Sequence, residues 1–287
     1  MEKSPVGNIC DFHHLPQWAK DNHYIWTGYR TLTNSYVGCV KTLLFLHNET
    51  GNILSHLFGF LVLSGLIYYN HWIAFVGTDM GFWDKAVVDI FLASTAACLG
   101  CSSFFHLVIC HSEPVCRKWA CLDYAGIALL IMGSTFPAVY YGFYCEPFFR
   151  GIYLSITTTL ALSTIVITSN PKYANSEYRH TRVGLFLALA FSGSLPLSHL
   201  FFKDQLAEMI STGCFPSFHL MSVVNFIGTV SYAYRVPERW FPGHFDYFGN
   251  SHQVLHVCVV IAALFHYSGV MSLVRFFHSG TYQCPVQ

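Results

Sequence analysis

Residues 251–275 have the sequence SHQVLHVCVVIAALFHYSGVMSLVR, in which Arg275 is the only residue of the Asp, Glu, Lys and Arg types. A helix needs about 20 predominantly apolar residues to cross the hydrocarbon core of a bilayer. This stretch meets that length. Six further stretches meet it too, near residues 51–70, 86–110, 121–142, 149–169, 183–202 and 214–234. We therefore predict an all-α fold, a bundle of seven transmembrane helices.

The composition of the 287-residue chain also indicates a protein that lies in a membrane. Hydrophobic residues make up 53% of it and charged residues only 10%, whereas soluble domains carry roughly 25% charged residues. The charges of 15 basic and 15 acidic residues cancel. The chain therefore lacks the excess of positive charge that binds the phosphate backbone of a nucleic acid. The composition predicts an integral, multi-pass membrane protein. It excludes a soluble enzyme, a disordered protein and a nucleic-acid binder.

The eleven cysteines show no paired CxxC spacing of the kind that marks a zinc ribbon. Free cysteine behaves as a small hydrophobic residue and is commonly buried. We therefore expect buried free thiols.

The distribution of Lys and Arg predicts the orientation of the bundle. With a cytosolic N-terminus, 11 of these residues fall in cytosolic segments, and the opposite side holds only Lys85, Arg150, Lys203 and Arg275. Cytosolic loops of membrane proteins carry an excess of Lys and Arg. The N-terminus is therefore expected in the cytosol, and the C-terminus on the extracellular or lumenal side.

This topology predicts three parts of the chain. Residues 1–50 form a cytosolic segment, residues 51–275 the transmembrane domain, and residues 276–287 a short extracellular or lumenal tail. Residues 40–46 are apolar but too short to span the membrane. They form either a juxtamembrane helix at the interface or an extension of the first membrane helix, and both alternatives stay open.

Five polar residues fall within the predicted spans at one depth. Ser102 and His106 are four residues apart, as are His252 and His256, so each pair shares a helix face. The second span, which carries Ser102 and His106, ends at the cytosolic side. Asp123 lies at the start of the third span and His252 and His256 at the start of the seventh, and both of these spans begin at the same side. Because ionisable groups inside a membrane are costly, such residues are candidates for function.

Three histidines form the pattern of a catalytic zinc site, since neutral imidazoles suit Zn²⁺ and leave a fourth position for water. We predict His106, His252 and His256 as metal ligands. Asp123 is expected to hydrogen-bond the water or act as its base, and Ser102 to orient a ligand or donate to an oxyanion. The alternative is that each histidine is hydrogen-bonded separately in the bundle.

A second set of polar residues lies at the start of the first predicted span, at the same membrane depth. Glu49, Asn52 and His56 share a helix face, because they are three and four residues apart. They either support the histidine site or form a polar lock between helices, and we favour the lock.

Three motifs carry a family resemblance: Glu49-Thr-Gly-Asn-Ile-Leu-Ser-His56, Ser102-Ser-Phe-Phe-His106 with Asp123, and Ser251-His-Gln-Val-Leu-His256. They resemble the motifs of the progestin and adipoQ receptor family, and the likeness extends over nearly the whole chain. Residues 122–133 and 236–243 are similar to the adiponectin receptors. Residues 20–25 and the Cys284-Pro285 ending are more similar to the Raf-kinase-trapping-to-Golgi branch.

The resemblance implies Zn²⁺ on His106, His252 and His256, with Asp123 and Ser102 beside it. An adiponectin receptor-like chain implies a receptor in lipid-metabolic signalling, with an extracellular protein or steroid as ligand. It also implies ceramidase activity, the hydrolysis of the amide of a ceramide-like lipid that enters from the bilayer.

The Golgi branch implies a different function, a non-enzymatic Golgi or ER tether that binds a cytosolic signalling kinase and uses zinc structurally. Plasma membrane and Golgi or ER locations both stay open. The presence of Ser102 and Asp123 favours the hydrolase, because a structural zinc site needs neither residue and is more often closed by a fourth protein ligand.

Overall fold

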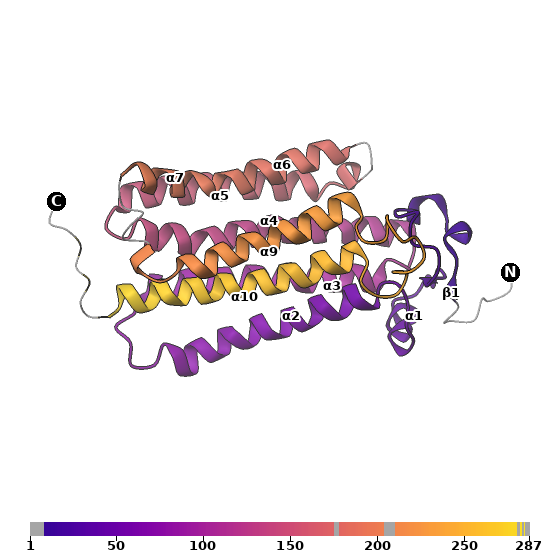
Figure 1. Ribbon diagram of the computed structural model, residues 1–287, viewed down its shortest axis with the longest axis horizontal. Helices are drawn as coiled ribbons and strands as arrows, with labels where there is room; N and C mark the ends of the chain where they lie inside the picture. The colour runs from indigo at the N-terminus through magenta and orange to yellow at the C-terminus, as the bar shows by residue number, and fades with distance from the viewer. Residues whose placement is uncertain (1–8, 175–177, 204–209, 280–281, 283, 285–287) are drawn as a thin grey trace.

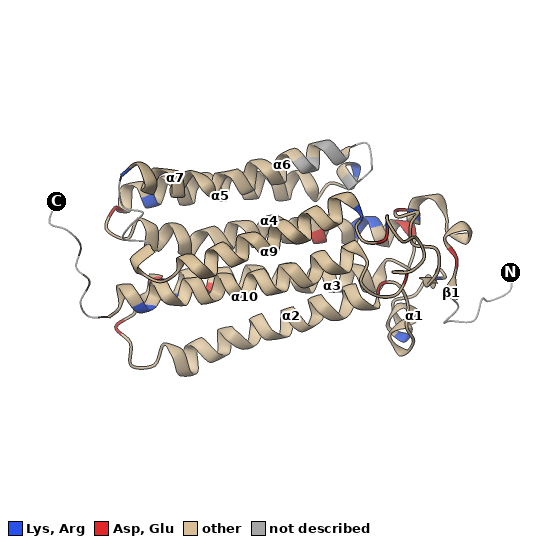
Figure 2. Cartoon of the chain, viewed as in Figure 1, with Lys and Arg blue, Asp and Glu red and all other residues tan. Residues whose placement is uncertain are grey.

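The computed structural model describes residues 9–174, 178–203, 210–279, 282 and 284. These residues form an elongated bundle of long helices with a folded cap at the N-terminal end (Figure 1). Charged residues gather towards the two ends of the bundle, and the helices between are mostly uncharged (Figure 2).

The long helices are α2 (Thr50–Tyr69), α3 (Phe82–Val108), α4 (Glu113–Gly142), α5 (Pro147–Thr168), α6 (Arg179–Ser192), α7 (Ser194–Phe202), α9 (Phe215–Tyr234) and α10 (Ser251–Phe277). The shorter elements are β1 (Ile9–Cys10), η1 (Phe12–His14), η2 (Gln17–Ala19), β2 (Tyr29–Arg30), α1 (Tyr36–Lys41), η3 (Thr42–Leu44), the π-helical η4 (Asn70–Ala74) and η5 (Pro171–Ala174).

Two helices differ from the predicted spans. α4 begins at Glu113 and not near 121, and a proline in its first turn suits a helix start. The prediction follows only the apolar stretch and so leaves out the polar first turns of this helix. The helix predicted over 183–202 is divided into α6 and α7 at Gly193.

Six helical segments in the described part of the chain are long and apolar enough to cross a membrane: α2 with η4, α3, α4, α5, residues 184–202, and α10. The prediction of an integral, multi-pass membrane protein is confirmed. α9 has 20 residues and packs along α10, but polar residues such as His219 and Asn225 lower its hydropathy. A seventh span therefore stays a prediction.

Small residues allow α3 and α4 to pack closely, as is common where helices meet in membranes. A Cβ atom added to Gly133 would lie 2.7 Å from the Cβ atom of Ser94, and one added to Gly126 would lie 3.0 Å from the Cα atom of Cys98. Both neighbouring atoms are fixed by the backbone of α3. Neither glycine can gain a side chain unless the two helices separate.

The cap joins the N-terminal segment to the connection between α9 and α10. Asp246 is buried, and its carboxylate accepts hydrogen bonds from the backbone N–H groups of Trp26 and Thr27, at 3.0 and 2.8 Å. Glu238 is fully buried and accepts from the N–H of Ser251 at 2.8 Å. A carboxylate at this first residue of α10 also complements the helix dipole.

Residues 40–46 are not a continuation of α2. They contain the end of α1, then η3, and Phe45 is extended before α2 begins at Thr50. α1 buries Gly38 and Cys39, while Val37 and Val40 are exposed on its other side. Placement of α1 at a membrane surface stays a prediction, as does the division of the chain at residues 50 and 275.

A disulfide joins Cys145, just after α4, to Cys284 in the C-terminal tail. The expectation of free thiols is therefore wrong for this pair, and the other nine cysteines are not disulfide-bonded. The two partners are 139 residues apart in sequence and belong to no motif that would indicate pairing. Within the predicted tail, residues 280–281, 283 and 285–287 lie outside the described residues.

The α3–α4 contact generates a prediction. Gly133→Ala should destabilise the protein by about 1–3 kcal/mol, the usual cost of overpacking a well-packed interior, and lower its thermal midpoint in detergent. Gly151→Ala is the control, because an added Cβ there meets nothing within 4 Å in α5. Equal midpoints for the two variants would show that α3 and α4 do not need the close approach.

Candidate functional site

Three histidines converge at the end of the bundle that carries α1. His106 lies in the last turn of α3, and His252 and His256 lie in the first two turns of α10. One ligand nitrogen of each lies within 4.8 Å of the other two. The predicted convergence is confirmed, and these separations are compatible with one shared metal ion.

The first turn of α10 is fixed from both sides. The Asn250 side chain caps the helix by accepting from the N–H of Gln253 at 3.1 Å. The Gln253 amide donates to the carbonyls of Asn48 and Tyr247, at 3.0 and 2.9 Å. These bonds attach the start of α10 to the residues just before α2 and so place His252 and His256.

Arg30 fixes the end of α3. It is only 4% exposed, and its guanidinium donates to the carbonyl oxygens of His106 and Leu107, at 2.6 and 3.0 Å. It also donates to the Thr42 hydroxyl at 2.9 Å. Terminal helix carbonyls lack partners within the helix, so Arg30 satisfies those beside a site histidine. The sequence does not predict this role, because Arg30 is recognised there only as one of the 11 basic residues in cytosolic segments.

Glu49 sets the orientation of His106. Its carboxylate lies 2.7 Å from Nδ1 of His106, and it accepts from the Asn52 amide at 2.7 Å. An Nδ1–H that donates to a carboxylate leaves Nε2 as the unprotonated ligand atom. Nε2 of His106 is buried and has no hydrogen-bond partner among the described residues. An unpartnered buried nitrogen of this kind fits a metal ligand.

The two ionisable residues at the start of α2 have pKa values below their ordinary values. Burial acts to raise the pKa of Glu49, but the neighbouring His106 outweighs it and holds the pKa below the ordinary value. Burial, with a contribution from Arg30, lowers the pKa of His47 to about 3. His47 is thus neutral, and its Nδ1 accepts from the N–H of Glu49 at 3.2 Å.

The remaining polar residues of α2 support His256. Its Nδ1 lies 3.2 Å from the carbonyl oxygen of Asn52, and its ring stacks on that of His56 with centroids 3.6 Å apart. Both ring nitrogens of His56 are buried without a partner in the described part of the chain. Glu49, Asn52 and His56 therefore contact the site histidines directly and are more than a lock between helices.

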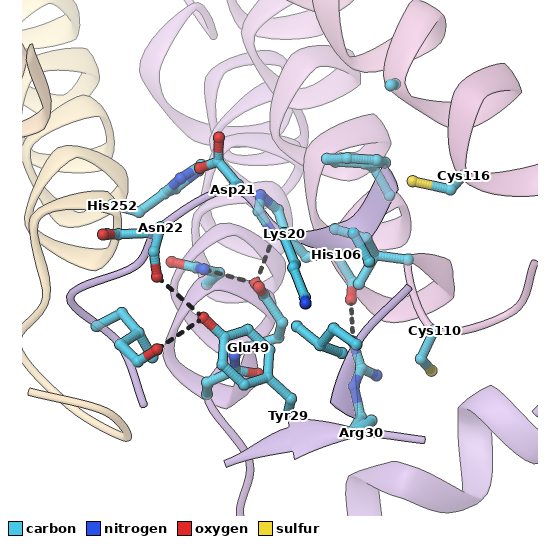
Figure 3. A pocket seen from close by; sticks show the side chains of 18 of the residues that line it. Lys20, Asp21, Asn22, Tyr29, Arg30, Glu49, His106, Cys110, Cys116 and His252 are labelled. Carbon is cyan, nitrogen blue, oxygen red and sulfur yellow. Dashed lines mark hydrogen bonds and ion pairs between the residues drawn. The ribbon is translucent and has the colours of Figure 1, made fainter. Parts of the chain in front are cut away.

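His252 forms part of a cavity wall. It packs against the Tyr232 ring, with centroids 5.1 Å apart. With His106 it lines a cavity of about 1120 Å³ between the N-terminal segment and the ends of α3, α4, α9 and α10 (Figure 3). The histidine cluster is thus accessible from the capped end of the bundle.

Ser102 and Asp123 lie beside the cluster. Ser102 is 3% exposed and one turn before His106 in α3. The Ser102 hydroxyl and the His106 ring are neighbours of the Asp123 carboxylate, which comes from α4. Asp123 is not a member of the three-histidine group found among the described residues. Its position fits a role beside a metal ion, and the roles of both residues stay predictions.

Comparison with known proteins gives matches over most of the chain. A family model described as Haemolysin-III related matches residues 44–267. "Adiponectin receptor protein" of Drosophila melanogaster is 37% identical over 97% of this chain and 62% of its own length. "Progestin and adipoQ receptor-like protein 1" of Caenorhabditis elegans is 36% identical over 97% and 63%. "Progestin and adipoQ receptor family member 3" of Homo sapiens is 32% identical over 96% and 89%.

The chain thus spans less than two thirds of the length of the fly and nematode relatives, but nearly nine tenths of the human one. All three motifs of the site fall within the regions compared.

The Glu49–His106 contact predicts an effect on metal binding. Glu49→Gln keeps the side-chain size but removes the charge, so zinc affinity should fall by about 10–100-fold, as is usual when the partner of a ligating histidine is changed. Competition with a chelator, followed by elemental analysis, measures this. Glu113→Gln is the control, because Glu113 is a half-buried carboxylate whose ion-pair partner is Arg117 of the same helix. Unchanged affinity in Glu49→Gln would mean that Glu49 does not orient a ligand.

Proposed function

Because the chain belongs to the Haemolysin-III related family, the family of the progestin and adipoQ receptors, we propose that it is a seven-helix membrane receptor with a zinc-dependent lipid amide hydrolase site. The observation that carries this proposal is the convergence of His106, His252 and His256, whose ligand nitrogens lie within 4.8 Å of one another. The ligand would be an extracellular protein or a steroid.

The donor set supports zinc. Imidazole nitrogens suit Zn²⁺, and three protein ligands without a fourth are typical of catalytic zinc sites. Nδ1 of His106 and Nδ1 of His256 already have oxygen partners, at 2.7 and 3.2 Å, so their Nε2 atoms would hold the ion. Bound zinc would supply Lewis acidity and bring the pKa of a coordinated water towards about 7.

The residues beside the histidines would supply the acid–base chemistry. Asp123 would accept a proton from the attacking water and deliver it to the amide nitrogen that leaves. Ser102 would donate a hydrogen bond to the Asp123 carboxylate or to the developing oxyanion. The substrate would be a ceramide-like lipid, cleaved to a fatty acid and a sphingoid base, as the resemblance to adiponectin receptors implies.

The roles proposed for Asp123 and His106 predict different effects of their substitution. Asp123→Asn should keep most of the zinc and the fold, but lose about 10²–10⁴-fold in hydrolysis, the range usual for a positioned general acid or base. His106→Ala should lose zinc, stability and hydrolysis together, because it removes a ligand and the contact between α2 and α3. Zinc content, thermal midpoint and ceramide turnover are measured on the same purified samples, with and without chelator.

Equal turnover by Asp123→Asn and the unaltered chain would remove Asp123 from the mechanism. No turnover by the zinc-loaded chain, across several acyl chain lengths, would favour the alternative. In that alternative the protein is a non-enzymatic Golgi or ER tether of a signalling kinase, and zinc joins helices structurally. The N-terminal part of the cap, residues 9–49, lies at the end of the bundle where α2 begins (Figure 1) and would then be the surface that binds the kinase.

Several observations support seven spans with a cytosolic N-terminus. α9 is 20 residues long and packs along α10, as a seventh membrane helix would. The Cys145–Cys284 disulfide lies at the end opposite α1, whereas Cys39 and Cys110 at the α1 end are free. Disulfides persist in oxidising compartments and are rare in the cytosol. The sulfur chemistry and the distribution of Lys and Arg therefore favour the same orientation.

The topology can be tested with an epitope tag at each terminus. Seven spans place the tags on opposite sides, so an antibody should detect the N-terminal tag only after the plasma membrane is permeabilised. The C-terminal tag should be detected on intact cells if the protein is at the plasma membrane, and only after full permeabilisation if it is in the Golgi or ER. Two tags on the same side would indicate six spans and contradict the proposal.

A further inference from the structure

Two free cysteines lie in contact outside the histidine site. Cys39 belongs to α1, and Cys110 follows the end of α3. Their Sγ atoms are 3.7 Å apart, with the thiol of Cys110 donating to Cys39. They are only 0% and 4% exposed, and they pack in one small cluster with Val108. The pair thus joins two segments that are 71 residues apart in sequence.

We propose that Cys39 and Cys110 are a redox modification site that forms a reversible disulfide between α1 and the end of α3. A disulfide has an S–S length of about 2.05 Å, so the two sulfur atoms need to approach by less than about 2 Å. α1 can supply this movement, because it is six residues long and only one side of it, at Gly38 and Cys39, is buried.

The surroundings of the pair favour thiolate chemistry. The hydrogen bond from Cys110 lowers the pKa of Cys39 to about 6, with contributions from Thr33 and Arg30 that outweigh burial. A thiolate is the reactive form of cysteine. Cys110 also lines the cavity beside the histidine cluster (Figure 3), which gives a small oxidant a route to the pair.

Hydrogen peroxide is an oxidant of sufficient strength and size. The thiolate of Cys39 attacks the O–O bond of the peroxide, which breaks to give a sulfenic acid on Cys39 and a hydroxide that takes up a proton to form water. The thiol of Cys110 then attacks the sulfenic sulfur and gives its proton to the departing hydroxyl, so that a second water leaves as the S–S bond forms. Overall, two thiols are oxidised by two electrons and one peroxide is reduced to two waters.

The cross-link would act on the end of α3 that carries His106. The hydroxyl of Thr42, three residues after Cys39, donates to the carbonyl of Cys39 at 2.6 Å and accepts from Arg30 at 2.9 Å. Arg30 in turn binds the carbonyl of His106. A disulfide would therefore hold α1 and this chain of contacts in one arrangement. The chemistry itself needs no metal, so its failure is distinct from failure of the zinc site.

The test uses the full chain in detergent or lipid nanodiscs. It is first treated with a mild reductant that is then removed, and next with hydrogen peroxide. Alkylation under denaturing conditions and peptide mapping without reductant should show the loss of both thiols and a new cross-linked peptide, lighter by two hydrogens. Dithiothreitol should restore both thiols. Amide hydrogen exchange over residues 36–44 should slow in the oxidised chain.

Two variants serve as controls. Cys110→Ala should abolish the cross-linked peptide, whereas Cys10→Ala should retain it, because Cys10 is a free, partly exposed cysteine in β1. Measurements on the unaltered chain alone are sufficient if Cys110→Ala does not fold. The proposal is overturned if both thiols stay alkylatable at a peroxide concentration that oxidises Cys10. It is also overturned if Cys39 or Cys110 pairs instead with another cysteine.

Discussion

The hydrogen bond between the Glu49 carboxylate and Nδ1 of His106 joins α2 to α3 at the level where α10 begins. The arrangement of the site depends on this contact. In an apolar interior a polar group without a partner costs several kcal/mol, so a hydrogen bond that satisfies two buried groups from different helices holds those helices together. Arg30 satisfies the last carbonyls of α3, and Gln253 connects α10 to the residues before α2. Three helix ends are thereby held together before any ligand binds.

Much of the fold was predictable, because bilayer thickness imposes one length on every spanning helix. That length located the helices, four-residue spacings put Ser102 with His106 and His252 with His256 on shared helix faces, and the orientation of the spans put these residues at a common depth. Residue number predicts membrane depth because the helices of a bundle run nearly parallel, so the position of a residue along its helix corresponds to its depth in the membrane. α4 and the divided α6–α7 pair differ from prediction where polar turns or a glycine, and not apolar length, decide the helix ends.

The contacts that the sequence did not reveal are made by single residues far apart in the chain. Arg30 has no pattern around it, and its capping role depends on the path of residues 31–42 beside α3. The Cys145–Cys284 bond likewise depends on the path of the tail. Glu49 was noted on its helix face, but the direction of that face was open until α2 and α3 were placed together. Periodicity predicts which face of a helix is buried, and it does not say which neighbour covers it.

The disulfide gives the two ends of the bundle different freedom. It closes a covalent ring that contains α5, α6, α7, α9 and α10 and leaves α2 and α3 outside. The tail that follows α10 is therefore covalently linked to the end of α4. The start of α10 contacts α2 and α3 only through non-covalent interactions. The histidines therefore belong to the end of the bundle where only non-covalent contacts hold α10 to α2 and α3, so a change in those contacts alters the site while the disulfide at the other end stays intact.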